Sequence, residues 1–213
     1  MTRLFRLTVA GFALALICSA GLAAQAGKRT TVADANTIAE AELAALPNMN
    51  AARARALVAA RPFLTAQAFD AFLTAQGLTA EQRTALYARV FVQINLNTAT
   101  REEILLVPGA GNRMAREFAE YRPWKSIPHF QKEIGKYVKP DELARLEQYV
   151  FIPINLNTAT DADMLTIPGV GARMVREFKE YRPWKTAGQF RKEIGKYVNQ
   201  KEVARLERYV VFQ

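Results

Sequence analysis

The sequence predicts an all-α protein made of three tandem four-helix units that follow a signal peptide. Two observations carry this prediction: a long segment occurs twice, and apolar residues recur at helical spacing with no long β-type alternation. Residues 94–151 and 154–211 align without a gap, and 37 of the 58 aligned positions are identical. A repeat of this length is typical of a small structural unit used more than once.

A fainter third copy precedes these two. The run Arg61-Pro62-Phe63 corresponds to Arg122-Pro123-Trp124, and Phe69 corresponds to Phe130. The predicted organisation is a signal peptide at 1–26 and units at 27–92, 93–152 and 153–213.

The first residues have the pattern of an export signal. Arg3 and Arg6 form a charged start, an apolar run covers 7–17, and small residues stand at 24–26. The pattern predicts cleavage after Ala26 and export to a bacterial periplasm or the cell surface. An uncleaved membrane anchor is the alternative, because the apolar stretch approaches spanning length.

The charge balance favours a polyanionic partner only mildly. The formal net charge is +9, and a basic surface suits nucleic acid or an anionic membrane.

The one cysteine, Cys18, lies in the predicted signal. The exported chain would therefore use neither disulfide nor thiolate chemistry.

The first helix of the second unit begins with Thr100 followed by Glu103, a capping-box pattern. Thr160 and Asp163 form a weaker version in the third unit. Pro108-Gly109 ends the helix. Its apolar face is predicted to consist of Ile104, Leu105 and Val107.

A second helix is expected from about Asn112. It should end before Arg122-Pro123, because the residue before proline disfavours the helical region. Trp124 is predicted to fill the core. The buried side of this helix is predicted to carry Met114, Ala115, Phe118 and Tyr121.

A third helix is expected at 127–134, a turn at 135–138 and a fourth helix at 141–149. The side chains that face inward from the fourth helix and its end are predicted to be Leu143, Leu146 and Val150. Each unit is therefore predicted to consist of two successive helix–turn–helix hairpins.

Two segments resemble the helix-hairpin-helix motif: LLVPGAGNRMAREF and LTIPGVGARMVREF. With the INLNTAT opening and the pairing of hairpins, they resemble the ComEA-like domain of bacterial competence proteins. The resemblance implies sequence-independent binding of double-stranded DNA on its minor-groove side. It also implies a role in DNA uptake during natural transformation, with membrane-associated uptake proteins or other periplasmic proteins as further partners.

The hairpin chemistry can be argued without the family. Glycines permit positive φ and close backbone approach, and the first amides of the following helix have no intrahelical acceptor. Such amides bind an oxyanion, helped by the helix dipole. The candidate nucleic-acid-binding residues are Gly109, Gly111, Asn112, Arg113 and Arg116, with Gly169, Gly171, Ala172, Arg173 and Arg176. Lys136 and Lys196 are predicted auxiliary contacts.

A plainer interpretation stays open, in which the glycines serve only the turns and the arginines pair with acids four residues later. The protein would then be a non-catalytic periplasmic scaffold. The four candidate ion pairs are Arg113–Glu117, Arg116–Glu120, Arg173–Glu177 and Arg176–Glu180.

The first unit departs from this pattern. It has Pro47-Asn48-Met49-Asn50 in place of Pro-Gly-x-Gly. Asparagine tolerates the left-handed conformation, so the turn can survive, but its side chains would obstruct a phosphate.

Nothing in the sequence predicts catalysis. The one histidine, His129, is replaced by Gln189 in the other copy, and no His, Cys, Asp and Glu cluster has metal-ligand spacing. We therefore expect neither an enzyme nor a metal, cofactor or small-molecule substrate. The repeated aromatic residues are predicted to be core.

Overall fold

The structure, a computed structural model, describes residues 31–212. Helices dominate it, and no strand in this range is longer than two residues, so the predicted all-α class is confirmed. No helix between residues 31 and 212 combines the length and apolar character needed to cross a bilayer. The predicted signal peptide, 1–26, lies outside the described residues.

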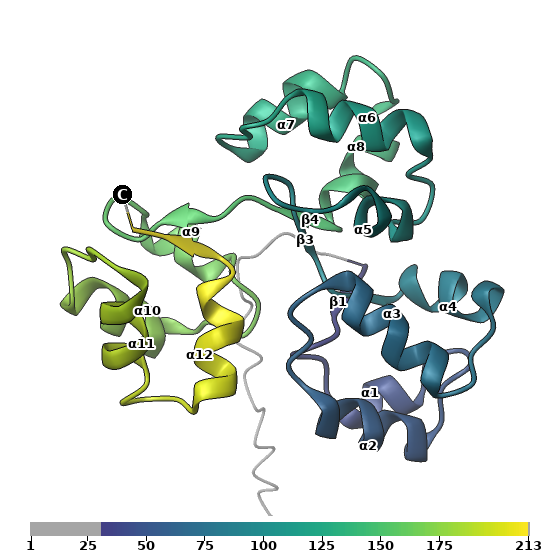
Figure 1. Ribbon diagram of the computed structural model, residues 1–213, viewed down its shortest axis with the longest axis horizontal. Helices are drawn as coiled ribbons and strands as arrows, with labels where there is room; N and C mark the ends of the chain where they lie inside the picture. The colour runs from purple at the N-terminus through teal and green to yellow at the C-terminus, as the bar shows by residue number, and fades with distance from the viewer. Residues whose placement is uncertain (1–30, 213) are drawn as a thin grey trace, which may run out of the picture.

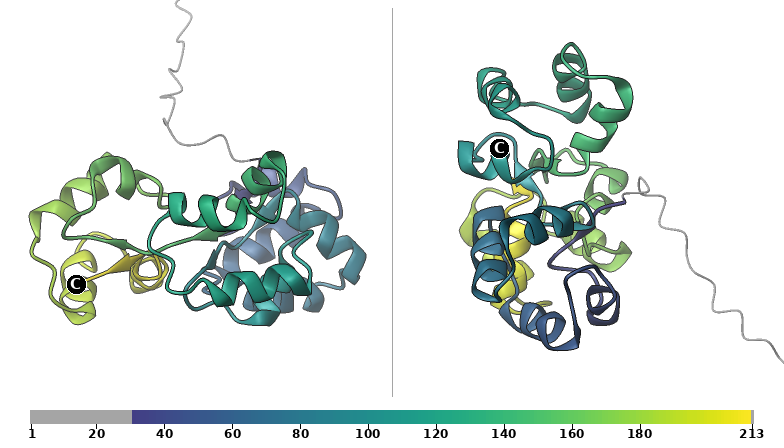
Figure 2. Two further views of the ribbon diagram at one scale, coloured as in Figure 1. Left: turned by 90° about the horizontal axis from the view of Figure 1, so that it is seen from above. Right: turned by 90° about the vertical axis from the view of Figure 1, so that its right-hand side faces the viewer.

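The helices lie in three lobes around a common centre (Figure 1), and the first and third lobes stand at opposite ends when the molecule is seen from above (Figure 2). We call these lobes the first, second and third units. The first contains α1 (Glu40–Ala44), α2 (Ala51–Ala60), α3 (Ala66–Ala75) and α4 (Ala80–Tyr87). The second contains α5 (Arg101–Leu106), α6 (Asn112–Glu120), α7 (Ile127–Ile134) and α8 (Pro140–Glu147). The third contains α9 (Asp161–Leu165), α10 (Ala172–Glu180), α11 (Ala187–Ile194) and α12 (Gln200–Glu207).

A pair of short parallel strands joins the beginning of each unit to its end. The pairs are β1 (Ala33–Asp34) with β2 (Val90–Phe91), β3 (Ile94–Asn95) with β4 (Val150–Phe151), and β5 (Ile154–Asn155) with β6 (Val210–Val211). Since helical periodicity carries no signal for two-residue strands, the sequence did not predict them.

One arginine in the middle of each unit donates hydrogen bonds to the segment with which the chain enters that unit. Arg122 Nε donates to Leu96 O at 2.7 Å, and its Nη2 donates to Ala99 O at 2.6 Å. Arg61 and Arg182 make the corresponding pairs of bonds in the first and third units. The same pattern of contacts therefore recurs in all three lobes.

An asparagine completes this arrangement by binding the backbone of the core aromatic residue. Asn97 Oδ1 accepts from Trp124 N at 2.6 Å, and Asn97 Nδ2 donates to Trp124 O at 2.9 Å. Trp124 is buried, as predicted, and its indole N–H donates to Phe118 O at 2.8 Å. Asn157 holds Trp184 in the same way.

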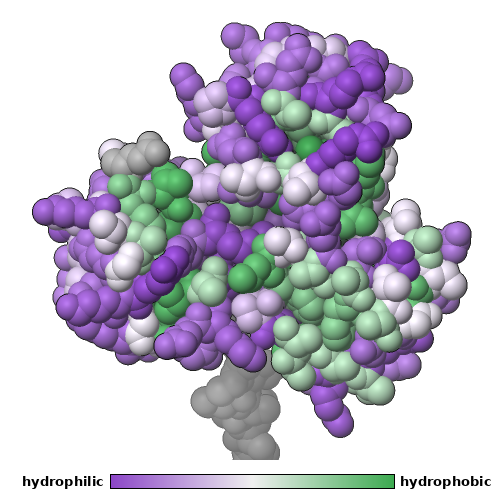
Figure 3. All heavy atoms as spheres, in the orientation of Figure 1, coloured by the Kyte–Doolittle hydropathy of each residue, from purple (hydrophilic) through white to green (hydrophobic). Residues whose placement is uncertain are grey.

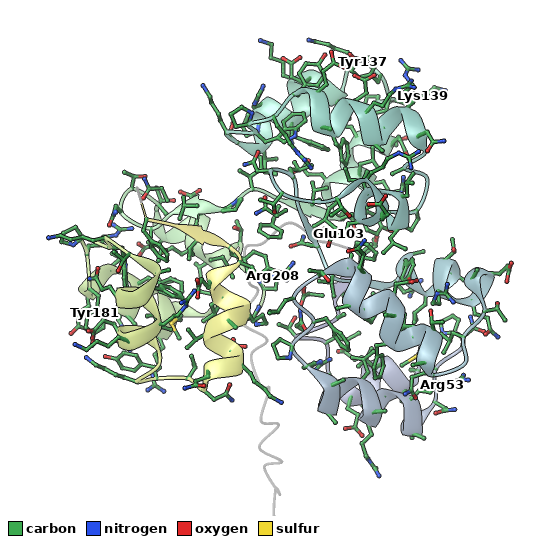
Figure 4. All side chains as sticks on the ribbon, viewed as in Figure 1. Arg53, Glu103, Tyr137, Lys139, Tyr181 and Arg208 are labelled. Atoms are coloured by element: carbon green, nitrogen blue, oxygen red, sulfur yellow. The ribbon has the colours of Figure 1, made fainter. Side chains whose placement is uncertain are left out.

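The apolar core has two parts. One continuous cluster runs through the first and second units, and a second cluster consists of the third unit together with Phe151 of β4. Phe91 of the first unit packs edge-on against Tyr149 of the second, with ring centroids 5.3 Å apart. Glu103, at the junction of these units (Figure 4), accepts a hydrogen bond from Ala66 N, which begins α3, at 3.2 Å.

Several predicted boundaries are confirmed. Helix α6 begins at Asn112, α7 covers Ile127–Ile134, and Thr100 forms the predicted capping box with Glu103. The fourth helix is shifted: α8 covers Pro140–Glu147 because proline fits its first turn, and the chain turns into β4 after Gln148.

One core prediction is wrong. Leu105 is 37% exposed, although Ile104 and Val107 are buried as predicted. Ile104 and Val107 lie three positions apart on one face of the helix, which leaves Leu105 on the outer side.

Candidate nucleic-acid interface

The turn between α5 and α6 contains a glycine that the fold requires. Gly109 has φ +77°, and a Cβ atom at this position would lie 2.7 Å from Arg145 Nη2. Gly169, in the turn between α9 and α10, also has φ +77°. A Cβ atom there would lie 3.1 Å from Arg205 Nη2. Backbone conformation and space both favour glycine at these two positions.

The second glycine of each turn does not use the positive φ that glycine permits. Gly111 and Gly171 precede α6 and α10 with φ values of −84° and −113°, which other residues adopt readily. A Cβ atom at either position would meet nothing within 4 Å. No contact within the described residues therefore requires glycine at 111 or 171.

These two glycines leave the helix beginnings open. No side chain caps α6 or α10, whereas Thr100, Ser126, Thr160 and Thr186 cap the helices that precede or follow them. The first-turn amides of α6 and α10 thus have no side-chain cap, and the residues at these helix beginnings, 111–113 and 171–173, are exposed at the positive end of the helix dipole.

The first unit shows the closed version of the same turn. Asn48 has φ +64° and occupies the position of Gly109, as the sequence predicted. Asn50 occupies the position of Gly111, and its Oδ1 accepts from Arg53 N at 2.8 Å. Its side chain therefore takes the place at the start of α2 that α6 and α10 leave free.

The four candidate arginines are exposed on the first two turns of α6 and α10. Among the described residues, ion pairs within 4.0 Å link other charged groups, and none joins Arg113, Arg116, Arg173 or Arg176 to the glutamate four positions later. Arg113 instead lies over the Tyr137 ring, 5.0 Å from its centroid. These cations are thus available to a ligand in solution.

The residue after each open glycine differs between the two sites. Asn112 Oδ1 accepts from Arg101 Nη2 at 2.6 Å, which adds a further cation beside the hairpin of the second unit. Ala172 has no side-chain polar group, so it could offer only its backbone amide.

The two predicted auxiliary lysines are paired within their own units. Lys136 forms an ion pair with Glu133, and Lys196 forms one with Glu193. This pairing holds the pKa of Glu133 below its ordinary value. Lys136 also lies 5.5 Å from the centroid of Tyr121, whose hydroxyl is 2.8 Å from that of Tyr137. Lys136 therefore lies near Arg113 on the same pair of rings.

Sequence reasoning missed two arginines that lie directly beneath the hairpins. Arg145 and Arg205 lie beside Gly109 and Gly169 and form bidentate pairs with Glu142 and Glu202. The side chain of Arg145 is 31% exposed, but that of Arg205 is only 2% exposed. Arg145 and Arg205 are the same residue at equivalent positions of the two copies, and this identity is the sequence signal that could have found them.

Each hairpin also has the first unit as a neighbour. Residues 105–111 and part of α3 and α4, including Arg83 and Tyr87, line a cleft of about 430 Å³. Thr37 Cγ2 lies 3.1 Å from the Cβ position of Gly169. The first unit itself presents a broad, weakly hydrophobic surface in Figure 3, where hydrophilic residues cover most of the second unit.

Within residues 31–212, no group of three or more His, Cys, Asp and Glu side chains is placed to hold a metal ion. His129 instead lies against the Trp124 ring, with centroids 5.2 Å apart.

Comparisons with known proteins give one distant relative. The chain is 25% identical, over an alignment of 128 residues, to endonuclease/exonuclease/phosphatase family domain-containing protein 1 of Xenopus laevis. The match covers 42% of this chain and 21% of that protein, so the chain spans about a fifth of the relative's length. No family model and no solved structure matches the chain.

Proposed function

We propose that this protein is an exported, non-catalytic, helix-hairpin-helix protein of the ComEA-like type that binds double-stranded DNA without regard to sequence. The observation that carries the proposal is the contrast at the helix beginnings. The side chain of Asn50 caps the N-terminus of α2. Gly111 and Gly171 leave α6 and α10 without such a cap, although a larger side chain would fit at both positions. An open helix N-terminus flanked by exposed arginines suits a phosphate oxygen.

The proposed contacts are to the DNA backbone. Amides of the hairpins and the arginines at 113, 116, 173 and 176 would bind phosphates, which fix position and carry no sequence information. The proposed role is to receive or retain incoming DNA during natural transformation.

Affinity should depend steeply on salt. Two hairpins that each neutralise about two phosphates give a slope of log K against log salt of about −3.5. Fluorescence anisotropy with unrelated duplexes should show roughly micromolar binding at moderate salt and equal affinity for each sequence. A salt-independent curve, or no binding at low salt, would contradict the proposal.

Replacing Gly111 and Gly171 with asparagine should separate DNA binding from stability. Both positions have ordinary φ and open space, so asparagine should fit and cap the helix as Asn50 does. Such a cap exceeds glycine by only about a few tenths of a kcal/mol, so the melting temperature should stay level or rise slightly. Affinity for duplex DNA should fall roughly fivefold, because the amide side chain competes with phosphate for the first-turn amides.

Alanine at the same two positions is the matched control. It adds a Cβ atom without an acceptor, so it should weaken DNA binding less than asparagine does. Equal DNA affinity in the parent and the asparagine variant would show that phosphates do not use these helix beginnings.

A protein-binding scaffold is the second candidate, and one observation favours it. Leu105 and Leu165 occupy equivalent positions just before the two hairpins and are 37% and 48% exposed. Exposed leucines beside both turns would suit an apolar partner surface. Unchanged DNA binding in the asparagine variant would move this candidate ahead.

A further inference from the structure

The first and third units meet at a buried junction that is rich in charge. Four side-chain atoms there are buried and have no hydrogen-bond partner: Asp34 Oδ2, Arg205 Nη1, Arg208 Nη1 and the Tyr209 hydroxyl. Arg205 and Arg208 lie close enough to act on the pKa of the Asp34 carboxyl, although no ion pair within 4.0 Å joins them to it among the described residues. Burial and Asp34 raise the pKa of Tyr209, while Arg208 and Arg205 act in the opposite direction. Arg208 lies at the end of α12 on the side that faces the first unit (Figure 4).

The charge of Asp34 is not needed for its local turn. Its Oδ1 accepts from Asn36 N at 2.9 Å. Asn95 and Asn155 occupy the equivalent positions in the other units and accept the same bond at the same distance. An asparagine therefore suffices for this turn.

The charge of Arg208 is not needed for its local role either. Its Nη2 donates to Gln93 O, at the entrance of the second unit, at 2.8 Å. The equivalent residue, Gln148, binds the entrance of the first unit through Thr31 N, also at 2.8 Å. In the second unit the contact with the preceding unit is thus made by a neutral amide, which accepts through its oxygen where Arg208 donates.

Asp34 and Arg208 therefore face each other across the junction, and at both positions the other copies carry a neutral residue. Burial raises the pKa of Asp34, while Arg205, the Asn36 amide, Arg208 and Arg61 act in the opposite direction. The ionised carboxylate thus costs free energy that asparagine would not. A charge kept at such a cost fits a role in specifying one arrangement of units rather than in adding stability.

We infer that Asp34, which faces Arg208 and Arg205 at this junction, specifies the docking of the first unit on the third. The counterparts Asn95 and Gln148 are neutral, so only this combination of units brings the opposite charges together. Thr37 Cγ2 lies 3.1 Å from the Cβ position of Gly169, so this docking also places the first unit beside the hairpin at 168–171. The inference does not depend on DNA binding.

Single-molecule energy transfer between the units tests it. With Cys18 replaced by serine, dyes are attached to cysteines at Arg55 in α2 and Lys192 in α11, whose side chains are 79% and 78% exposed. A second pair, Arg55 and Lys132, reports on the first and second units, since Lys132 is the equivalent of Lys192 and is 77% exposed. The substitutions are Asp34→Asn and Arg208→Gln, both residues that the sister units carry.

Each substitution should broaden the 55–192 distance distribution and leave the 55–132 distribution unchanged. The double variant should show no more broadening than either single variant, because both remove the same pair. Asp141→Asn, at an exposed acid away from the junction, should change neither distribution. Folding of each variant is checked by circular dichroism.

An unchanged 55–192 distribution in Asp34→Asn would overturn the inference, as would equal broadening of both distributions. Additive broadening in the double variant would show that Asp34 and Arg208 act separately. If Asp34→Asn does not fold, Arg208→Gln tests the same pair from the other side.

Discussion

Replacing Arg113, Arg116, Arg173 and Arg176 with glutamine should lower the affinity for duplex DNA by about tenfold or more. Loss of about four phosphate contacts should also flatten the slope of log K against log salt toward zero, since fewer counterions are released. Glutamine is a good helix former, and the described structure shows no ion pair at these arginines, so the melting temperature should change little. Fluorescence anisotropy over a salt series and thermal unfolding measure the two effects.

The matched control removes the same number of positive charges elsewhere. Arg55, Arg89, Lys132 and Lys192 are exposed, and none lies on α6, α10 or their hairpins. Their replacement with glutamine should lower DNA affinity much less than the hairpin variant does. Equal losses in both variants would indicate a diffuse charge effect, and a folded hairpin variant with parental affinity would favour the scaffold.

Trp124→Ala and Trp184→Ala should each destabilise the protein by about 3–5 kcal/mol, but in different parts of the chain. Trp124 belongs to the core shared by the first and second units, and Trp184 belongs to the separate core of the third. Loss of Trp124 should therefore unfold the first and second units together at lower denaturant, and loss of Trp184 should mainly affect the third.

The chain provides its own probes for this experiment because it has two tryptophans, one in each of these cores. In each variant the remaining tryptophan reports by fluorescence on the other core during urea unfolding. Hydrogen exchange then tracks the core that lost its indole. Equal shifts of both transitions in both variants would contradict the division into two cores.

Local sequence signals predicted much of the helical architecture. Pro108-Gly109, the Thr100 capping box and Arg122-Pro123 act within a few residues, so they fixed the ends of α5 and α6. Trp124 was predicted to be buried because the repeated aromatic residues recur on helix faces and beside Arg-Pro, as core residues do. The same local reasoning assigned Asn48 its left-handed conformation.

Features that depend on distant contacts could not be predicted in this way. Arg145 reaches Gly109 only because α8 packs beside the turn that precedes α6. The sequence also did not distinguish the two glycines of the motif, of which Gly109 has positive φ and Gly111 does not. Arg205 is 2% exposed while its equivalent Arg145 is 31% exposed, a difference that no periodicity encodes. DNA binding itself remains a prediction.

The parallel strand pairs have a consequence for how such a chain can grow. Ile94 lies beside Val150, and Ile154 lies beside Val210, so the polypeptide leaves each unit next to its point of entry and in the same direction. The backbone thus has nearly the same position and direction after a unit as before it. An in-frame duplication of the gene segment inserts another unit without changing the direction of the rest of the polypeptide. Divergence can then proceed copy by copy, with one copy giving up its open hairpin while its neighbours keep theirs.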